Sequence, residues 1–257
     1  MDGVEGVALG EGRTLLRDIV NGAELSFQDG RLSRGVGYGS ASSLTRHSLA
    51  RTGAILRLRQ RNRYFVHASG VVSPEGRALV FVGESGSGKS TIAFALARLG
   101  WSLLGDDGVV LEPLPTGTIV HGWRSPLLVS ASLEEHFPEL RGHSGDIIAG
   151  DKRARVPVHV EGSSHAALGA LVFVEQGGNG SLQLCGESHA LMQLIRQSPW
   201  VLLGDGFSDP HFSALRGIVA TTRLLSFRHG PPELRRVAEL FAGVGGPEPT
   251  GADTCHD

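Results

Sequence analysis

The sequence lacks features on which several classes of protein depend. Its 257 residues include only two cysteines, at positions 185 and 255, so a disulfide framework is not expected and a reducing cytoplasm is favoured. No apolar run approaches membrane-spanning length, and the first residues lack the basic and apolar segments of a secretory signal. Closely spaced cysteine and histidine pairs that would bind zinc are missing from the sequence. We therefore expect a cytoplasmic protein without membrane segments.

Lysine is scarce as well. Lys89 and Lys152 are the only two lysines, and arginine supplies the other 22 of the 24 basic residues. The formal net charge is −2 and no basic block dominates, so bulk binding of nucleic acid is not expected. Because the chain prefers arginine so strongly, a lysine marks a position where a compact ammonium group is favoured.

Glycine, in contrast, is abundant, and one glycine-rich stretch carries the strongest motif. Residues 78–82 predict a buried strand, residues 83–88 a turn and residues 92–99 a helix. The pattern Gly-x-x-x-x-Gly-Lys-Ser between a strand and a helix is typical of a phosphate-binding P-loop. A chance match is the alternative, and the flanking strand and helix argue against it. The predicted nucleotide-binding residues are Gly83, Glu84, Ser85, Gly86, Ser87, Gly88, Lys89, Ser90 and Thr91.

The residue types of this stretch suit a nucleoside triphosphate with Mg²⁺. Glycines let backbone N–H groups surround phosphate oxygens, and the start of a helix adds donors that have no partner in the helix. In P-loop enzymes the lysine reaches the β- and γ-phosphates, and the hydroxyl after it binds Mg²⁺. Lys89 is therefore expected on the phosphates and Ser90 on the metal.

A pair of carboxylates follows the next predicted strand, residues 101–104. Asp106 and Asp107 are placed to hold Mg²⁺ or to activate an attacking hydroxyl, although Gly-Asp-Asp-Gly also fits a plain turn. Because adjacent carboxylates repel each other, one can stay with the metal while the other accepts a proton. His67 lies on a predicted strand before the glycine-rich stretch, where the alternative is a histidine packed in the core.

Further elements are predicted from hydrophobic periodicity and turn residues. Residues 44–61 predict a helix, residues 64–73 and 77–82 a hairpin, and residues 188–196, 212–219 and 231–242 three more helices. Residues 167–175 predict an apolar strand, and the glycine-rich turn after it makes residues 181–185 the expected hairpin partner. Residues 221–227 predict another strand, and residues 138–155 a mobile loop before a strand at 156–160.

Residues 67–72, the glycine-rich motif, the helix end at Gly100 and residues 103–107 together resemble the HPr kinase/phosphorylase family. Its shorter relatives include enzymes encoded beside lasso-peptide precursors. The resemblance covers about residues 57–112 and implies an α/β P-loop kinase core related to phosphoenolpyruvate carboxykinase, with a mixed, bent sheet and flanking helices. The expected organisation is a small β-rich N-terminal lobe at residues 1–64, a kinase domain at 65–244 and a disordered tail at 245–257.

The resemblance also implies roles for single residues. Asp107 matches the family's proton acceptor, Asp106 its neighbour near the metal, and His67 the active-site histidine. Lys89 and Ser90 match the residues that contact the phosphates and Mg²⁺.

One family feature is missing from the sequence. In the family, a glutamate beside an Arg-Gly supplies a second metal ligand, and the corresponding region here contains Arg124 but no glutamate. A loop cation can stabilise charge on the transferring phosphoryl group, and a solvated loop is the alternative interpretation. The candidates for this phosphate or substrate contact are Lys152, Arg153, Arg155 and Arg124.

The expected function is transfer of the γ-phosphate of ATP, with Mg²⁺, to a serine hydroxyl of a peptide or protein, such as a lasso-peptide precursor. Two alternatives stay open: a kinase for a small hydroxylated metabolite, and a nucleotide-dependent regulatory module that hydrolyses ATP slowly. The paired carboxylates and His67 favour transfer, because a regulatory module needs no base. The expected partner is the peptide or protein substrate, and homo-oligomerisation stays open.

Overall fold

The fold is described from a computed structural model. The described residues are 4–123, 128–129, 131–140, 154–155, 163–178, 180–230, 236–241 and 244. Several sequence predictions lie outside these ranges: Arg124, Lys152 and Arg153, most of the loop at 138–155, the strand at 156–160 and the tail at 245–257. Within the described ranges, no helix is both long and apolar enough to cross a membrane.

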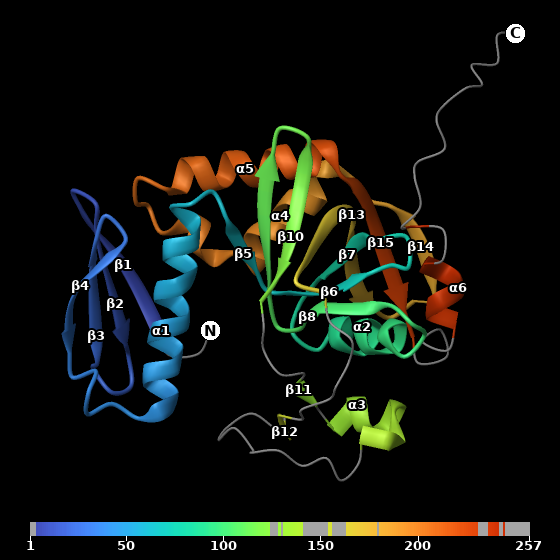
Figure 1. Ribbon diagram of the computed structural model, residues 1–257, viewed down its shortest axis with the longest axis horizontal. Coiled ribbons are helices and arrows are strands. Elements are labelled where there is room, and N and C mark those ends of the chain that lie inside the picture. Colours follow the sequence, from blue (N-terminus) through green and yellow to red (C-terminus); the bar gives the residue numbers. More distant parts are fainter. Residues whose placement is uncertain are drawn as a thin grey trace, which may run out of the picture.

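The first strands form a small antiparallel sheet in sequence order: β1 (Val4–Gly10), β2 (Arg13–Asp18), β3 (Glu24–Gln28) and β4 (Arg31–Val36). Helix α1 (Ser43–Arg59) lies along one face of this sheet (Figure 1). Alternate residues of the inner strands, Leu16, Leu25 and Phe27, share one core with Leu49 and Ile55 of the helix. The same core continues into the rest of the molecule through Phe65 and Trp200. A β-rich N-terminal region is therefore present, and the domain boundary at residue 64 stays a prediction.

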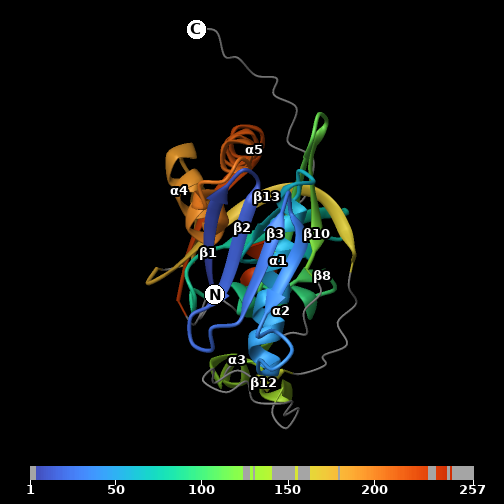
Figure 2. The same cartoon turned by 90° about the vertical axis from the view of Figure 1, so that its left-hand side faces the viewer.

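Nine strands of the described chain form a second, mixed sheet around the long strand β13 (His165–Gln176). Its main path runs through β5 (Tyr64–Val66), β9 (Val109–Leu114), β10 (Gly117–Gly122), β13, β7 (Arg77–Val82), β6 (Ala68–Val72) and β8 (Ser102–Gly105). Strand β13 is parallel to β7 and to β15 (Arg223–His229). Figure 2 shows how strongly β13 curves across the molecule. The predicted α/β class with a mixed, bent sheet is confirmed at this level.

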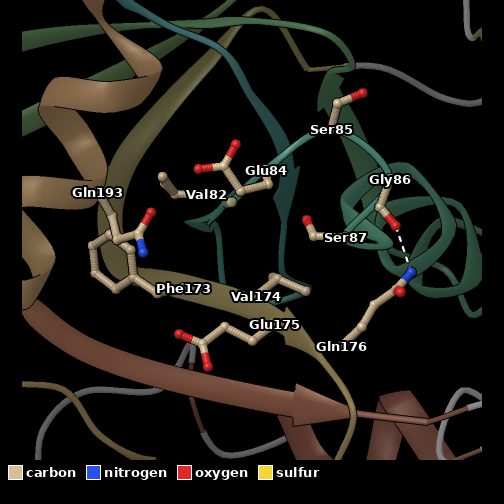
Figure 3. Close-up of a pocket in the computed structure, with 11 residues that line it drawn as sticks. Val82, Glu84, Ser85, Gly86, Ser87, Phe173, Val174, Glu175, Gln176 and Gln193 are labelled. Carbon is tan, nitrogen blue, oxygen red and sulfur yellow. Dashed lines mark hydrogen bonds between the residues drawn. The ribbon is translucent and has the colours of Figure 1, made fainter.

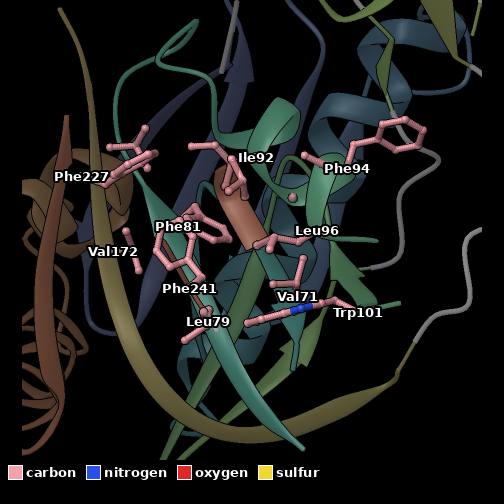
Figure 4. Packing of buried hydrophobic residues seen from close by; sticks show 14 of the residues in the cluster. Val71, Leu79, Phe81, Ile92, Phe94, Leu96, Trp101, Val172, Phe227 and Phe241 are labelled. Carbon is pink, nitrogen blue, oxygen red and sulfur yellow. The ribbon is translucent and has the colours of Figure 1, made fainter. Parts of the chain in front are cut away.

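Helices cover both faces of this sheet. Helices α2 (Lys89–Ala97) and α6 (Val237–Phe241) pack on one face, while α4 (Glu187–Gln197) and α5 (Ser208–Thr221) pack on the other. Side chains of a strand alternate between the faces, so Leu79 and Phe81 of β7 share one core with Ile92 of α2 (Figure 4). Val80 and Val82 of the same strand belong to the core under α4 and α5. A strand buried on both faces explains the continuous apolar run at residues 78–82.

One predicted pairing is wrong. Strand β14 (Ser181–Leu184) is not the hairpin partner of β13, because β15 lies between them, parallel to β13 and antiparallel to β14. The glycine-rich turn after β13 suggests that β13 and β14 form a hairpin. However, β15 is far more apolar than β14 and takes the place beside β13. Leu224, Leu225 and Phe227 of β15 are buried, whereas Leu184 of β14 is 83% exposed. Burial of the more apolar strand in the centre of the sheet therefore decides the order.

Most of the predicted helices and the β6–β7 hairpin are present, with shifts of a few residues at their ends. The predicted strand at 64–73 is divided into β5 and β6 by His67. Of the helix predicted at 231–242, the described part is α6, and residues 231–235 lie outside the described ranges. The remaining short elements are β11 (Leu128–Val129), α3 (Ala131–His136), a 3₁₀ turn at Pro138–Leu140, β12 (Ala154–Arg155) and a 3₁₀ turn at Pro199–Leu202.

Candidate active site

The site is built around the glycine loop, which we define as residues 83–88 between β7 and α2. Gly86 and Gly88 adopt positive φ angles of 81° and 98°, a region that residues with a Cβ rarely occupy. Helix α2 then begins at Lys89, so its first backbone N–H groups lie where the loop ends. Ser90 and Thr91 follow in the first turn of the helix. The predicted strand, loop and helix are therefore found in the predicted order.

Lys89 lies across the loop. Its side chain is buried, and Nζ donates hydrogen bonds to the carbonyl oxygens of Gly83 at 2.8 Å and Glu84 at 2.9 Å. A buried ammonium group held against loop carbonyls is poised to meet anionic oxygens at the same place. This arrangement fits the role predicted for Lys89.

Two close approaches hold the loop against the sheet. A Cβ on Gly83 would lie 2.5 Å from the carbonyl oxygen of Val174 in β13, so only glycine fits there. On the other side, Nε2 of His229 lies 2.6 Å from the carbonyl oxygen of Ser87, to which it donates a hydrogen bond. His229 is buried in β15, and no sequence motif marks it. The loop is therefore supported by strands that are distant in the sequence.

Gly88→Ala is expected to destabilise the protein more than Gly86→Ala. Both residues have positive φ, which costs about 1 kcal/mol for alanine. A Cβ at position 88 would also lie 2.6 Å from the His229 ring, whereas a Cβ at position 86 meets nothing within 4 Å. We expect a further loss of about 1–3 kcal/mol for the Gly88 variant, measured as the free energy of unfolding in urea. Equal losses in the two variants would contradict the contact with His229.

Asp106 joins the glycine loop to the neighbouring strands. It is 1% exposed, and its Oδ1 accepts hydrogen bonds from Ser69 Oγ at 2.7 Å and Ser90 Oγ at 2.8 Å. Its other oxygen, Oδ2, is buried without a hydrogen-bond partner among the described residues. A buried carboxylate oxygen without a partner is costly unless something else occupies that position. Together with the Ser90 hydroxyl it offers the oxygen ligands that Mg²⁺ prefers.

Asp107 points to a different set of partners. Its backbone is left-handed with φ of 63°, its Oδ1 lies 3.2 Å from His67 Nδ1, and its Oδ2 lies 2.9 Å from Arg51 Nη1. Arg51 Nη2 also donates to the backbone oxygen of Asp107 at 2.9 Å. One guanidinium therefore fixes both the side chain and the backbone of Asp107. The structure places His67 beside Asp107, next in the chain to Asp106, and it adds Arg51.

Arg51 comes from helix α1, outside the segment that carries the recognised motifs. Its guanidinium also lies over the Phe65 ring, 5.4 Å from the ring centroid. Sequence reasoning missed this residue because arginine is common in the chain and nothing local indicates a partner 56 positions away. The N-terminal region thus contributes directly to the site.

The surroundings of His67 favour the uncharged form of its ring. Burial, reinforced by the positive charge of Lys89, lowers the pKa of His67, and the nearby Asp107 only partly opposes this effect. The ring is therefore neutral near pH 7, and its Nδ1 lies 3.2 Å from the Asp107 carboxylate. Its backbone N–H is fixed by the carbonyl oxygen of Gln197, so the ring is anchored at the junction of β5 and β6.

A cavity of about 400 Å³ opens beside the glycine loop (Figure 3). The loop forms one wall, the end of β13 forms the floor, and Gln193 reaches in from helix α4. Gln176 closes one corner by donating a hydrogen bond to the carbonyl oxygen of Gly86 at 2.6 Å. The remaining predicted cations are not placed at this site. Arg155 is described only as a residue of β12, paired with Leu128, and the other three lie outside the described ranges.

No protein-family model matches the chain, and no curated protein matches it. Among solved structures, the chain is similar to the HPr(Ser) kinase/phosphatase from Coxiella burnetii, with 12% sequence identity and a TM-score of 0.36. The match covers 70% of this chain and 94% of that one. At this TM-score the likeness between the two folds is distant.

Proposed function

We propose that the protein binds ATP with Mg²⁺ at the glycine loop and transfers the γ-phosphate to a serine hydroxyl of a peptide or protein. One observation carries this proposal. Asp106 binds the Ser90 hydroxyl in the first turn of α2, and the next residue, Asp107, is held by His67 and Arg51. A candidate metal site and a candidate base are thereby adjacent at the end of a phosphate-binding loop.

The residues present fit a nucleoside triphosphate and its metal. The backbone of the glycine loop, the start of α2 and Lys89 would hold the phosphates. Ser90 Oγ and Asp106 Oδ2 would hold Mg²⁺, which fits the lack of another partner for Oδ2 within the described chain. When bound, Mg²⁺ supplies charge neutralisation on the phosphate oxygens.

The transfer step assigns a separate task to Asp107. The serine oxygen of the substrate forms a bond to the γ-phosphorus, and the bond from that phosphorus to the β,γ-bridging oxygen breaks. ADP leaves with the electron pair of that bond, and the serine proton passes to the Asp107 carboxylate. His67 and Arg51 orient the carboxylate, since each contacts one of its oxygens. Lys89 stabilises the charge on the phosphoryl group.

The direct test is incubation of the protein with ATP, Mg²⁺ and serine-containing peptides, followed by mass spectrometry of the peptide and measurement of ADP. Because of the sequence resemblance, a lasso-peptide precursor is the first substrate to include. One phosphate gained by the peptide for each ADP formed supports the proposal. A parallel incubation replaces the peptides by small hydroxylated metabolites. Phosphate gained only in that incubation, or ADP formed with no phosphorylated product, supports one of the two alternative functions instead.

Ser90→Ala is expected to raise the Mg²⁺ concentration needed for half-maximal transfer by about tenfold or more. The substitution removes one proposed metal ligand and also the hydrogen bond that orients Asp106. The measurement is a titration of the transfer rate with Mg²⁺ at saturating ATP. Ser213→Ala, at an exposed serine of helix α5 outside the site, is the matched control and should leave the titration unchanged. An unchanged Mg²⁺ requirement in Ser90→Ala would remove this residue from the metal site.

A further inference from the structure

Two residues that line the cavity beside the glycine loop have buried polar atoms without a partner among the described residues. Gln193 Oε1 is an unpaired acceptor on helix α4, and Ser87 Oγ is an unpaired hydroxyl on the loop. Ser87 as a whole is only 7% exposed. Buried polar atoms in a folded protein are nearly always hydrogen-bonded, so two of them in one cavity indicate a ligand with complementary groups.

The charges around the cavity select against an anionic ligand. Both charged residues in its lining are carboxylates, Glu84 and Glu175. Each has a basic neighbour: Arg196 lies 3.8 Å from Glu84, and Arg228 lies 3.0 Å from Glu175. The carboxylates are therefore largely compensated, and no basic residue of the described chain lines the cavity itself. A neutral ligand fits this environment better than a further phosphate.

The position and the walls of the cavity point to the nucleoside end of a nucleotide. The cavity opens at the carboxyl ends of the parallel strands β7 and β13, the usual place for ligands in such sheets. Val82, Phe173 and Val174 give it apolar walls, which suit a planar ring. Its volume of about 400 Å³ lies in the range of small-molecule sites. Because the glycine loop forms one wall, a nucleotide whose phosphates lie on the loop can reach it (Figure 3).

The geometry points to an adenine site in this cavity, with Gln193 Oε1 accepting a hydrogen bond from the exocyclic amine of the base. This inference rests on the proposed binding of ATP at the glycine loop. Gln193 reaches in from α4 opposite the loop, so its side chain is placed to contact the base. In the amide orientation of the structure, Oε1 is the atom without a partner among the described residues, and guanine would meet it with an acceptor because guanine carries a carbonyl oxygen where adenine carries the amine.

The test is calorimetric binding of three Mg²⁺-loaded ligands to the full chain: AMP-PNP, GMP-PNP and inorganic tripolyphosphate. We expect the wild-type protein to prefer AMP-PNP over GMP-PNP. Gln193→Leu should weaken AMP-PNP by about tenfold and leave tripolyphosphate unchanged, because only the contact with the base is lost. Met192→Gln places an amide on the neighbouring, exposed position of the same helix and should change none of the affinities.

The outcomes separate the two proposals. AMP-PNP binding that is equally strong in Gln193→Leu, beside normal tripolyphosphate binding, overturns the adenine site and leaves the phosphate site standing. Equal affinity of the wild-type protein for AMP-PNP and GMP-PNP also overturns it. If neither AMP-PNP nor tripolyphosphate binds the wild-type protein, the proposed function fails first. Retained tripolyphosphate binding shows that the Gln193→Leu variant is folded.

Discussion

Asp107→Asn is expected to lower kcat for phosphate transfer by about 10²–10⁴-fold, the range typical for loss of a general base. Asparagine keeps the shape of the side chain and tolerates the left-handed backbone at φ of 63°. It cannot take up the serine proton. Nucleotide binding should change little, since Lys89, Ser90 and Asp106 are untouched. Steady-state kinetics with ATP and the peptide substrate would show a fall in kcat with a nearly constant KM for ATP.

Asp29→Asn is the matched control for this experiment. Asp29 is an exposed aspartate that also has a left-handed backbone, with φ of 46°, and it lies in the turn between β3 and β4. We expect normal kinetics from it. Full activity of Asp107→Asn would show that the base is assigned to the wrong residue.

Two further variants separate positioning from proton transfer. Arg51→Gln should lower kcat by about tenfold, because Asp107 loses the group that fixes its side chain and its backbone. His67→Gln should have a similarly moderate effect if His67 only orients Asp107. A loss larger than that of Asp107→Asn would instead identify His67 Nε2 as the proton acceptor, with Asp107 as its orienting partner.

The second large expected effect is a loss of folding stability at acid pH that is caused by His211. This residue of α5 is 2% exposed, its ring stacks on Tyr64 with centroids 4.5 Å apart, and neither ring nitrogen has a hydrogen-bond partner among the described residues. Burial, followed by the positive charge of Arg59, lowers the pKa of His211 to about 3. As the pH falls, His211 is protonated near pH 6.5 in the unfolded chain but only near pH 3 in the folded protein.

The sign of the pH dependence follows from that difference. Because the pKa of His211 is lower in the folded state, its stabilising contribution is complete above pH 6.5 and is lost as the pH falls from 6.5 towards 3. We expect the free energy of unfolding to fall by about 2 kcal/mol between pH 7 and pH 5 from this group alone. His211→Phe keeps an aromatic ring beside Tyr64 and should remove this part of the pH dependence, as measured by urea unfolding at several pH values.

His47→Phe is the comparison, since His47 is exposed on helix α1. Its unfolding should depend on pH as in the wild-type protein. The same decline from pH 7 to pH 5 in His211→Phe and in the wild type would mean that other groups cause it.

A feature could be predicted from the sequence when the residues that determine it are close together in the chain. The strand, loop and helix from residue 77 to residue 97 were predictable because an apolar run, two glycines with positive φ and an alanine-rich helix lie side by side in the chain. The convergence of Asp106, Asp107 and His67 on this loop was predicted through the family resemblance. Their individual contacts were not.

The features that were missed depend on partners far away in the sequence. The pairing of β14 was wrong because a glycine turn indicates a hairpin locally, whereas the buried side chains of β15 decide the order of the sheet. Arg51 and His229 were missed because each acts on a residue 56 or 142 positions away, and neither belongs to a motif. The cavity at Gln193 forms only when α4 is packed above β13. Local patterns therefore locate the chemistry, and tertiary packing supplies the residues that position it.

The hydrogen bond from His229 to the carbonyl oxygen of Ser87 has a consequence for the timing of synthesis. Because the two residues are 142 positions apart, at about 5–20 residues per second the ribosome takes roughly 7–28 s to add His229 after Ser87. The strands that support the glycine loop are also synthesised late, since β13 and β15 follow the loop in the chain by about 80 residues or more. The nascent chain therefore carries the loop for many seconds before its support exists. The glycine loop therefore gains its full support only once β15 has entered the sheet.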